Sequence, residues 1–133
     1  MNKRRLFIVE IVNTIHAPKA IGPYSQGMIW NELIFSSGQI PIDPITGKMV
    51  ECDIEGQAEQ VMKNVEAVLR EAGTTLSHVV KTTCFLQNME DFATFNKVYE
   101  KYFIGKPARS CVAVKALPKN ALCEVEVIAV REK

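Results

Sequence analysis

The sequence has no long hydrophobic run and no excess of charge of either sign. Among its 133 residues, no uninterrupted apolar stretch exceeds four residues. A membrane-spanning helix needs about 20 such residues, so no membrane association is predicted. The 16 Lys and Arg residues against 15 Asp and Glu leave a net charge of +1. A dedicated nucleic-acid-binding module normally carries a clear basic excess, so nucleic acid is not expected as a partner.

Histidine is sparse, and the four cysteines lie far apart in the sequence. No Cys-x-x-Cys pair occurs, and the two histidines, His16 and His78, stand in unrelated contexts without a zinc-ligand pattern. No signal-peptide pattern follows the basic N-terminus, so we expect free thiols and a cytoplasmic protein. Glycine-rich phosphate-binding motifs are missing, and we predict neither a metal nor an organic cofactor. The cysteines are Cys52, Cys84, Cys111 and Cys123.

The length and the 47% hydrophobic content predict a single domain over residues 1–133. In some segments the apolar residues recur at every second position, and in others they recur about every 3.6 positions. Segments of the two kinds alternate along the chain, which predicts an α+β fold with a mixed sheet and two helices packed on one face. Strands are expected at Leu6–Val12, Met28–Trp30, Leu33–Ser37, Val79–Gln87, Ser110–Ala116 and Leu122–Val130.

The two helices have recognisable ends. Asp53 is placed to cap the first helix, which Gly73 would end. Asn88 is placed to cap the second, which Gly105 and Pro107 would stop. Apolar stripes are predicted at Ala58, Val61, Met62, Val65, Val68, Leu69 and Ala72 on the first helix, and at Phe92, Phe95, Tyr99, Tyr102 and Phe103 on the second.

Two helices on one face leave the other face of the sheet uncovered. We expect Cys123, Val125, Val127 and Ala129 on that face, where they would need a partner. Packing against other copies of the chain is the simplest solution, so a homo-oligomer is predicted.

Arg109 follows Pro107 at the start of a predicted strand. A guanidinium held there suits bidentate capture of a carboxylate, although an ordinary surface arginine fits the same pattern. Cys111 shares the face of Arg109 and could act as a nucleophile, but without a nearby histidine a packed thiol fits better.

Glu124 and Glu126 share one face of the last strand, about 7 Å apart by strand geometry. Partial burial would raise a carboxylate pKa and make it a usable general base. The alternative is that both face solvent or pair with lysine. Other candidates are Tyr24 in a Gly-Pro loop, Ser37 and Gly38 at a strand end, and the polar residues Lys81 and Asn96, each of which also has a structural explanation.

Taken together, the motifs resemble the RidA family, also called YjgF and earlier L-PSP. The matching stretches are Ala20-Ile-Gly-Pro-Tyr-Ser-Gln-Gly27, Ser37-Gly-Gln-Ile-Pro41, Asn64-Val65, Asp91-Phe-Ala93, Asn96-x-Val98-Tyr99, Pro107-Ala-Arg-Ser-Cys111, Leu117-Pro118 and Glu124-Val-Glu-Val-Ile-Ala-Val130. The resemblance implies a chorismate-mutase-like fold that assembles as a homotrimer around a barrel, with active sites between subunits.

The resemblance also implies an activity, the cofactor-independent hydrolysis of 2-imino acids such as 2-iminobutanoate and 2-iminopropanoate to 2-keto acids and ammonia. Pyridoxal-phosphate enzymes release these reactive imines. By motif position, Arg109 would bind the substrate carboxylate and Glu124 would position or activate water. Tyr24, Ser37, Gly38, Asn96 and Cys111 would line the pocket.

Two alternative functions stay open at the level of sequence. One is an endoribonuclease that inhibits translation, an activity reported for some relatives. The near-neutral charge and the lack of a paired histidine count against it. The other is a non-enzymatic trimer that binds 2-keto acids or acts like a chaperone.

Overall fold

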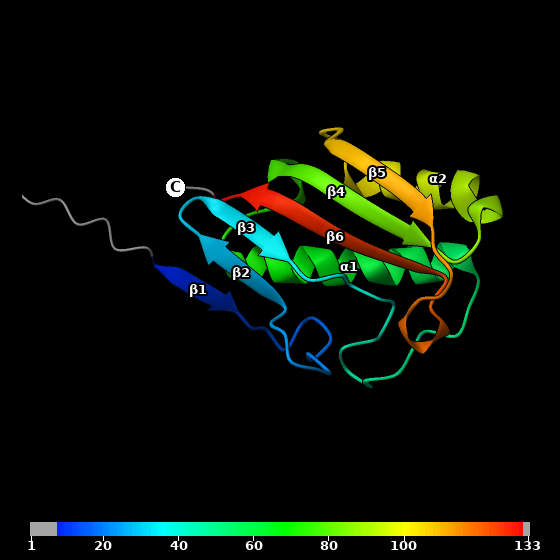
Figure 1. Ribbon diagram of the computed structural model, residues 1–133, viewed down its shortest axis with the longest axis horizontal. Helices are drawn as coiled ribbons and strands as arrows, with labels where there is room; N and C mark the ends of the chain where they lie inside the picture. Colours follow the sequence, from blue (N-terminus) through cyan, green and yellow to red (C-terminus); the bar gives the residue numbers. More distant parts are fainter. Residues whose placement is uncertain (1–7, 132–133) are drawn as a thin grey trace, which may run out of the picture.

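The protein, described over residues 8–131 by a computed structural model, is built on one mixed β-sheet (Figure 1). Its six strands lie in the order β1-β2-β3-β6-β4-β5. Only β4 and β5 pair in parallel, and the other neighbours are antiparallel. The strands are β1 (Val9–Val12), β2 (Gly27–Trp30), β3 (Leu33–Ser36), β4 (Val79–Leu86), β5 (Ala108–Ala113) and β6 (Cys123–Val130).

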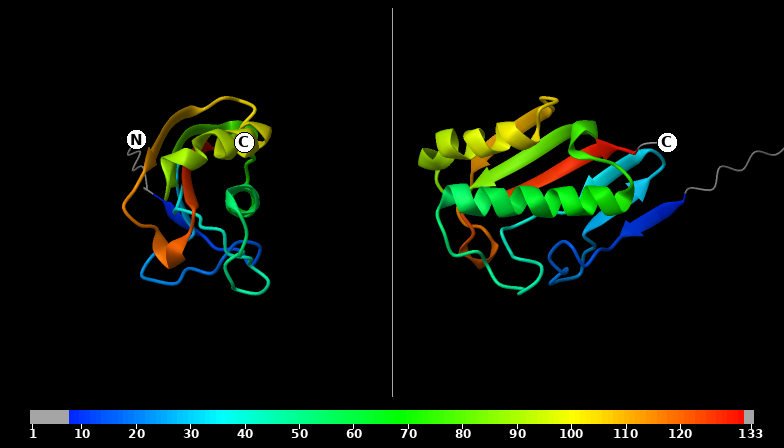
Figure 2. Two further views of the ribbon diagram at one scale, coloured as in Figure 1. Left: turned by 90° about the vertical axis from the view of Figure 1, so that its right-hand side faces the viewer. Right: turned by 180° about the vertical axis from the view of Figure 1, so that it is seen from behind.

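Both helices, α1 (Ile54–Ala72) and α2 (Phe92–Tyr102), cover the same face of this sheet (Figure 2). The predicted α+β class and the placement of the helices are therefore confirmed. Short 3₁₀ turns precede β4, α2 and β6: η1 (Leu76–His78), η2 (Met89–Asp91) and η3 (Pro118–Asn120). No helix within residues 8–131 combines the length and apolar character that crossing a membrane requires.

The ends of α1 are those that the sequence predicts. The side chain of Asp53 accepts a hydrogen bond from the backbone N–H of Gly56, which satisfies a free donor of the first turn. Gly73 ends the helix with a φ of 90°, a left-handed conformation that glycine adopts at little cost. Every residue of the predicted apolar stripe of α1 is buried.

The start of α2 differs from the prediction. Asn88 accepts a hydrogen bond from the N–H of Glu90 and so caps η2, the turn before α2. Of the predicted stripe, Phe95, Tyr99 and Phe103 are buried, whereas Phe92 and Tyr102 are only half-buried. Val98 is an additional core residue of α2 that the prediction omits.

Several strand boundaries differ from the prediction by one to three residues, and β5 differs at both ends. β5 spans Ala108–Ala113 rather than the predicted Ser110–Ala116, because pairing with β4 begins at Ala108 and ends at Ala113. A turn with Lys106 at a φ of 53° precedes the strand. Arg109 is therefore the second residue of the strand, and does not lie just before it as predicted. β1 is observed from Val9, while Leu6 and Phe7 of the predicted strand lie outside the described residues.

The side chains expected on the uncovered face are in fact the core. Cys123, Val125, Val127 and Ala129 are at most 2% exposed and pack in the same cluster as the buried residues of α1. These four residues form the fully apolar face of β6, and this face packs against the helices because that side of the sheet excludes water most completely. The other face of β6, which carries Glu124 and Glu126, is the one on the open side of the sheet. The predicted placement of the four apolar residues on the open face is therefore wrong.

Candidate active site

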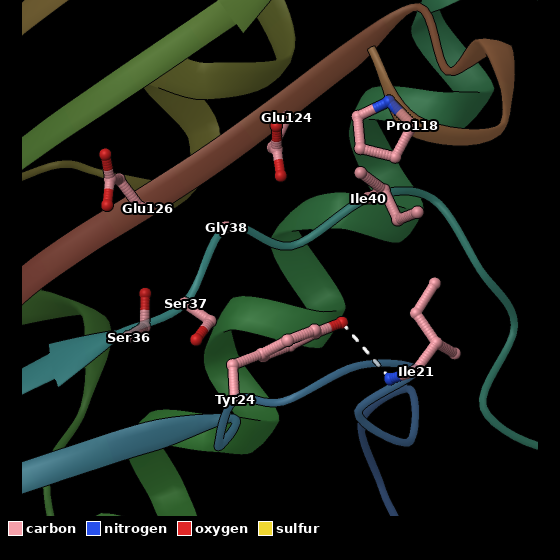
Figure 3. A pocket seen from close by; sticks show the side chains of 9 residues that line it. All are labelled: Ile21, Tyr24, Ser36, Ser37, Gly38, Ile40, Pro118, Glu124 and Glu126. Atoms are coloured by element: carbon pink, nitrogen blue, oxygen red, sulfur yellow. Dashed lines mark hydrogen bonds between the residues drawn. The ribbon is translucent and has the colours of Figure 1, made fainter.

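Four of the seven residues predicted to act in catalysis or binding line one cavity on the open face of the sheet. Tyr24, Ser37, Gly38 and Glu124 surround a space of about 510 Å³ (Figure 3). Glu124 projects from β6 toward the loop that carries Gly38, and the ring of Tyr24 lies on the opposite side. The remaining walls are formed by Ile21, Ser36, Ile40, Pro118 and Glu126.

Four of these wall residues are not among the predicted site residues: Ile21, Ser36, Ile40 and Pro118. Ile21, Ile40 and Pro118 lie within the stretches that resemble the RidA family, and this position in the sequence could have identified them as site residues. Ser36 had no such signal.

The loop before β2 is fixed by one buried side chain, Gln26. Its amide oxygen accepts from the N–H of Thr14 at 2.7 Å, and its amide nitrogen donates to the carbonyls of Thr14 and Pro18 at 3.0 and 2.8 Å. A buried amide with its bonding capacity filled holds two chain segments rigidly. Tyr24 lies two residues before this anchor in sequence, and its hydroxyl accepts a hydrogen bond from the N–H of Ile21 at 3.3 Å.

Gly38 permits the close approach of the Glu124 carboxylate to the backbone. A Cβ atom added at Gly38 would lie only 2.8 Å from Cδ of Glu124, closer than non-bonded atoms tolerate. The adjacent Ser37 is held by a hydrogen bond from its hydroxyl to the carbonyl of Ser25 at 2.5 Å. The absence of a side chain at Gly38 therefore leaves the space that the Glu124 carboxylate occupies in the cavity.

Glu124 is half-buried, and within residues 8–131 no cation forms an ion pair with it. Burial raises the pKa of its carboxyl group, and repulsion from Glu126 raises it further. Glu126 also lines a second cavity of about 190 Å³, together with Lys81. The predicted partial burial of one carboxylate is confirmed, although loops rather than the core cover it.

The other three predicted residues form a second group around Arg109. One of its guanidinium nitrogens donates to the side-chain oxygen of Asn96 on α2 at 2.7 Å. The guanidinium carbon lies 4.6 Å from the ring centre of Tyr99 and 5.5 Å from that of Phe92, within the range of cation–π attraction. Cys111 lies two residues further along β5 and is half-buried.

This environment holds Arg109 in place without neutralising it. Among the described residues, no Asp or Glu forms an ion pair with its guanidinium. A half-buried, oriented guanidinium with free N–H groups is a receptor for a carboxylate or another anion.

The two groups lie on opposite faces of the sheet. Glu124 is in register with Phe85 of β4, and Arg109 is in register with Thr82 of the same strand. Residues three apart in a strand point to opposite sides, so Arg109 shares the helix-covered face. One chain therefore presents an anion receptor and a carboxylate-lined cavity that cannot contact the same small molecule.

No cluster of three or more His, Cys, Asp or Glu side chains in residues 8–131 could hold a metal ion. The chemistry that this part of the chain offers is that of a guanidinium, a carboxylate with a raised pKa, hydroxyl groups and a thiol.

Several known proteins resemble this chain over most of its length. AldR of Lactococcus lactis, whose name describes it as a regulator, is 55% identical over 91% of this chain and 97% of its own. The 2-iminobutanoate/2-iminopropanoate deaminase of Salmonella typhimurium is 47% identical over 90% of this chain and 96% of its own.

A solved structure, that of Escherichia coli TdcF with bound serine, superposes with a TM-score of 0.88 at 42% identity. It covers 92% of this chain and 99% of its own. The family model described as endoribonuclease L-PSP matches residues 14–131. On this evidence the chain belongs to the L-PSP family, also called RidA or YjgF.

Proposed function

We propose that this protein hydrolyses 2-imino acids to 2-keto acids and ammonia, at sites formed between neighbouring copies in a homotrimer. One chain would contribute Arg109, Asn96 and Cys111. Its neighbour would contribute the cavity with Tyr24, Ser37, Gly38 and Glu124. The observation that supports this most is the half-buried Glu124 carboxylate, without a cationic partner among residues 8–131, in a cavity with ample room for a small 2-imino acid.

Arg109 is suited to hold the substrate carboxylate. Its contacts with Asn96, Tyr99 and Phe92 fix the plane of the guanidinium before the substrate arrives. A bidentate pair then sets the orientation of the substrate as well as its charge. Serine, the molecule bound to TdcF, has a carboxylate next to a carbon that carries nitrogen, as a 2-imino acid does.

Glu124 is suited to activate the attacking water. In the reaction, the water oxygen forms a bond to the imine carbon while Glu124 accepts a proton from that water. The π electrons of the C=N bond move to nitrogen, which takes up a proton. In the resulting tetrahedral intermediate, Glu124 returns its proton to the nitrogen and the hydroxyl group releases a proton to solvent. The C–N bond then breaks, which gives ammonia and the 2-keto acid. Because the pKa of Glu124 is raised, the carboxylate is a stronger base than an exposed glutamate.

The positions of the unpaired charges and of exposed apolar surface support the proposed assembly. On the open face, Phe35 is 39% exposed and Val112 is 46% exposed. Covering this face with another copy would remove apolar surface from water. The same contact can bring Arg109 of one chain to the cavity of the next, where each would gain an oppositely charged or polar partner.

The test is a coupled assay in which threonine dehydratase generates 2-iminobutanoate while semicarbazide traps it. Wild-type protein should suppress semicarbazone formation. Arg109→Ala should lose nearly all of this effect, and Arg70→Ala, which removes an exposed arginine of α1, should retain it. A wild-type protein without effect on the trap would refute the deaminase. Saturable binding of 2-ketobutyrate would then support a regulatory protein, and RNA cleavage that co-purifies with the protein would support an endoribonuclease.

A further inference from the structure

Two of the four cysteines are direct neighbours in the sheet. Cys84 of β4 and Cys111 of β5 are register partners in the parallel pair, so their side chains leave the sheet on the same face. Neighbouring strands lie about 4.8 Å apart. That separation falls within the Cα–Cα range of about 4.4–6.8 Å that a disulfide spans.

The two thiols differ in access and in chemistry. Cys84 is fully buried, and its sulfur lies 3.9 Å from the hydroxyl oxygen of Thr82. Cys111 is half-buried on the edge strand, two residues from Arg109. Hydrogen bonding with Cys84 lowers the pKa of Cys111 to about 7, and the charge of Arg109 contributes to this, whereas the pKa of Cys84 is raised. Cys111 is therefore the accessible nucleophile and Cys84 the protected second thiol.

We propose that Cys84 and Cys111 form a two-thiol oxidation site that hydroperoxides convert to an intrachain disulfide across β4 and β5. The Cys111 thiolate would attack one oxygen of hydrogen peroxide. The O–O bond breaks, and hydroxide leaves and takes up a proton to become water. The sulfur of Cys84 would then attack the sulfenic acid formed on Cys111, which breaks the S–O bond and releases a second water. The two thiols lose two electrons, and the peroxide gains them.

The remaining cysteines provide matched controls. Cys52 is exposed in the loop before α1, and Cys123 is buried on β6. Neither is in register with a cysteine in the described strands. Exposure alone would direct oxidation to Cys52, and burial alone would protect Cys123 as well as Cys84. Only the paired geometry predicts a link between Cys84 and Cys111.

The experiment uses the whole chain, reduced and then treated with hydrogen peroxide, followed by non-reducing digestion and mass spectrometry. Trypsin cuts after Lys81, Lys97, Arg109 and Lys115, which places the two cysteines in separate peptides, 82–97 and 110–115. We expect these peptides to be joined, with the loss of two hydrogen atoms. Free thiols should fall from four to two per chain. Peptides that stay unlinked, or links between different chains, would overturn the proposal.

Variants separate pairing from simple reactivity. In Cys84→Val, Cys111 should gain oxygen atoms instead of forming a link, because no second thiol can displace water. Cys123→Val should form the same link as the wild type. If Cys84→Val still loses two thiols to an intrachain disulfide, the pairing is wrong.

A second measurement needs no oxidation. Phenylarsine oxide condenses with two neighbouring thiols and releases one water. The wild-type chain should bind one equivalent and thereby protect Cys84 and Cys111 from alkylation. Cys52→Ser should bind as the wild type does, and Cys84→Val should not bind. An arsenical that leaves both cysteines open to alkylation in the wild type would contradict the proposed geometry.

Discussion

Arg109 and Glu124 face opposite sides of one β-sheet, although only β4 separates the strands that carry them. A guanidinium and a carboxylate so placed cannot act on the same small molecule within one chain. In a closed ring of identical chains, however, each interface can join the Arg109 side of one copy to the Glu124 cavity of the next. The proposed site would therefore exist only between copies of the chain in an oligomer.

This relationship predicts complementation between two inactive variants. Arg109→Ala and Glu124→Gln should each abolish imine hydrolysis alone. Trimers assembled from an equal mixture should regain roughly a quarter of the wild-type rate, because half of the chains supply each required residue and the two choices are independent. The rate is measured after the mixed chains are refolded together. A mixture as inactive as its components would place both residues of a working site in one chain, contrary to the proposal.

The helices and the succession of strands and helices along the chain can be predicted from the sequence because their signals are local. Asp53 and Gly73 mark the ends of α1 through their own backbone chemistry, and the structure places both as expected. The faces of β6 were not accessible in the same way. Both faces of Cys123–Val130 contain apolar residues. Which face packs against the helices depends on contacts with residues far away in the sequence.

For the candidate site, the sequence predicts which residues take part but not how they are arranged in space. Sequence motifs selected Arg109 and Glu124, but no local pattern tells that register places them on opposite faces. The close approach between Gly38 and Glu124 likewise joins residues that lie far apart in the chain. Such relationships arise from strand pairing between distant segments, which a single sequence does not specify.

Gly38→Ala should reduce the rate without unfolding the protein. The added methyl group would displace the flexible Glu124 side chain, whose atoms are the nearest neighbours of that position. A shift of about 1 Å at a reacting group can cost about 100-fold in rate. The melting temperature should stay close to that of the wild type. Gly105→Ala is the control, because its Cβ would meet only a backbone oxygen at an ordinary 3.7 Å. Full activity in Gly38→Ala would mean that the position of Glu124 is unimportant.

Glu124→Gln should stabilise the fold at neutral pH while it removes activity. Burial and Glu126 raise the pKa of the Glu124 carboxyl in the folded state above its ordinary value of 4.5. The folded state therefore binds this proton more tightly than the unfolded state, and wild-type stability falls as the pH rises from 4.5 through the folded pKa. Glutamine has no charge to bury and avoids this loss.

The check for Glu124→Gln is urea unfolding across a pH series. The advantage of the variant should be largest at neutral pH and should shrink as the pH falls toward 4.5. Glu51→Gln, which changes an exposed carboxylate, serves as the control for charge removal in general. An advantage that is equal at all pH values would show that titration of Glu124 is not its cause.

Asn64→Leu should destabilise the fold and loosen the cavity wall. The fully buried amide of Asn64 donates to the carbonyls of Ile40 and Ile42 at 3.1 and 2.9 Å, and accepts from Gln60 at 2.9 Å. Each carbonyl left without a donor should cost about 1–3 kcal/mol of unfolding free energy. Urea unfolding measures the loss. Gln60→Leu keeps both carbonyl bonds and should cost clearly less, so equal losses would argue against the role of Asn64 in holding the loop.

The reactivity of Cys111 should follow a thiolate with a pKa of about 7, well below that of an ordinary cysteine. The rate at which iodoacetamide alkylates peptide 110–115 in the folded protein should therefore reach half its maximum near this pH. Cys84→Val removes the largest cause of the lowered pKa, so its profile should move to higher pH. Cys84→Ser retains a hydrogen-bond donor and should stay closer to the wild type. If all three profiles coincide, the contact between Cys84 and Cys111 does not stabilise the thiolate, and Arg109 alone must account for its reactivity.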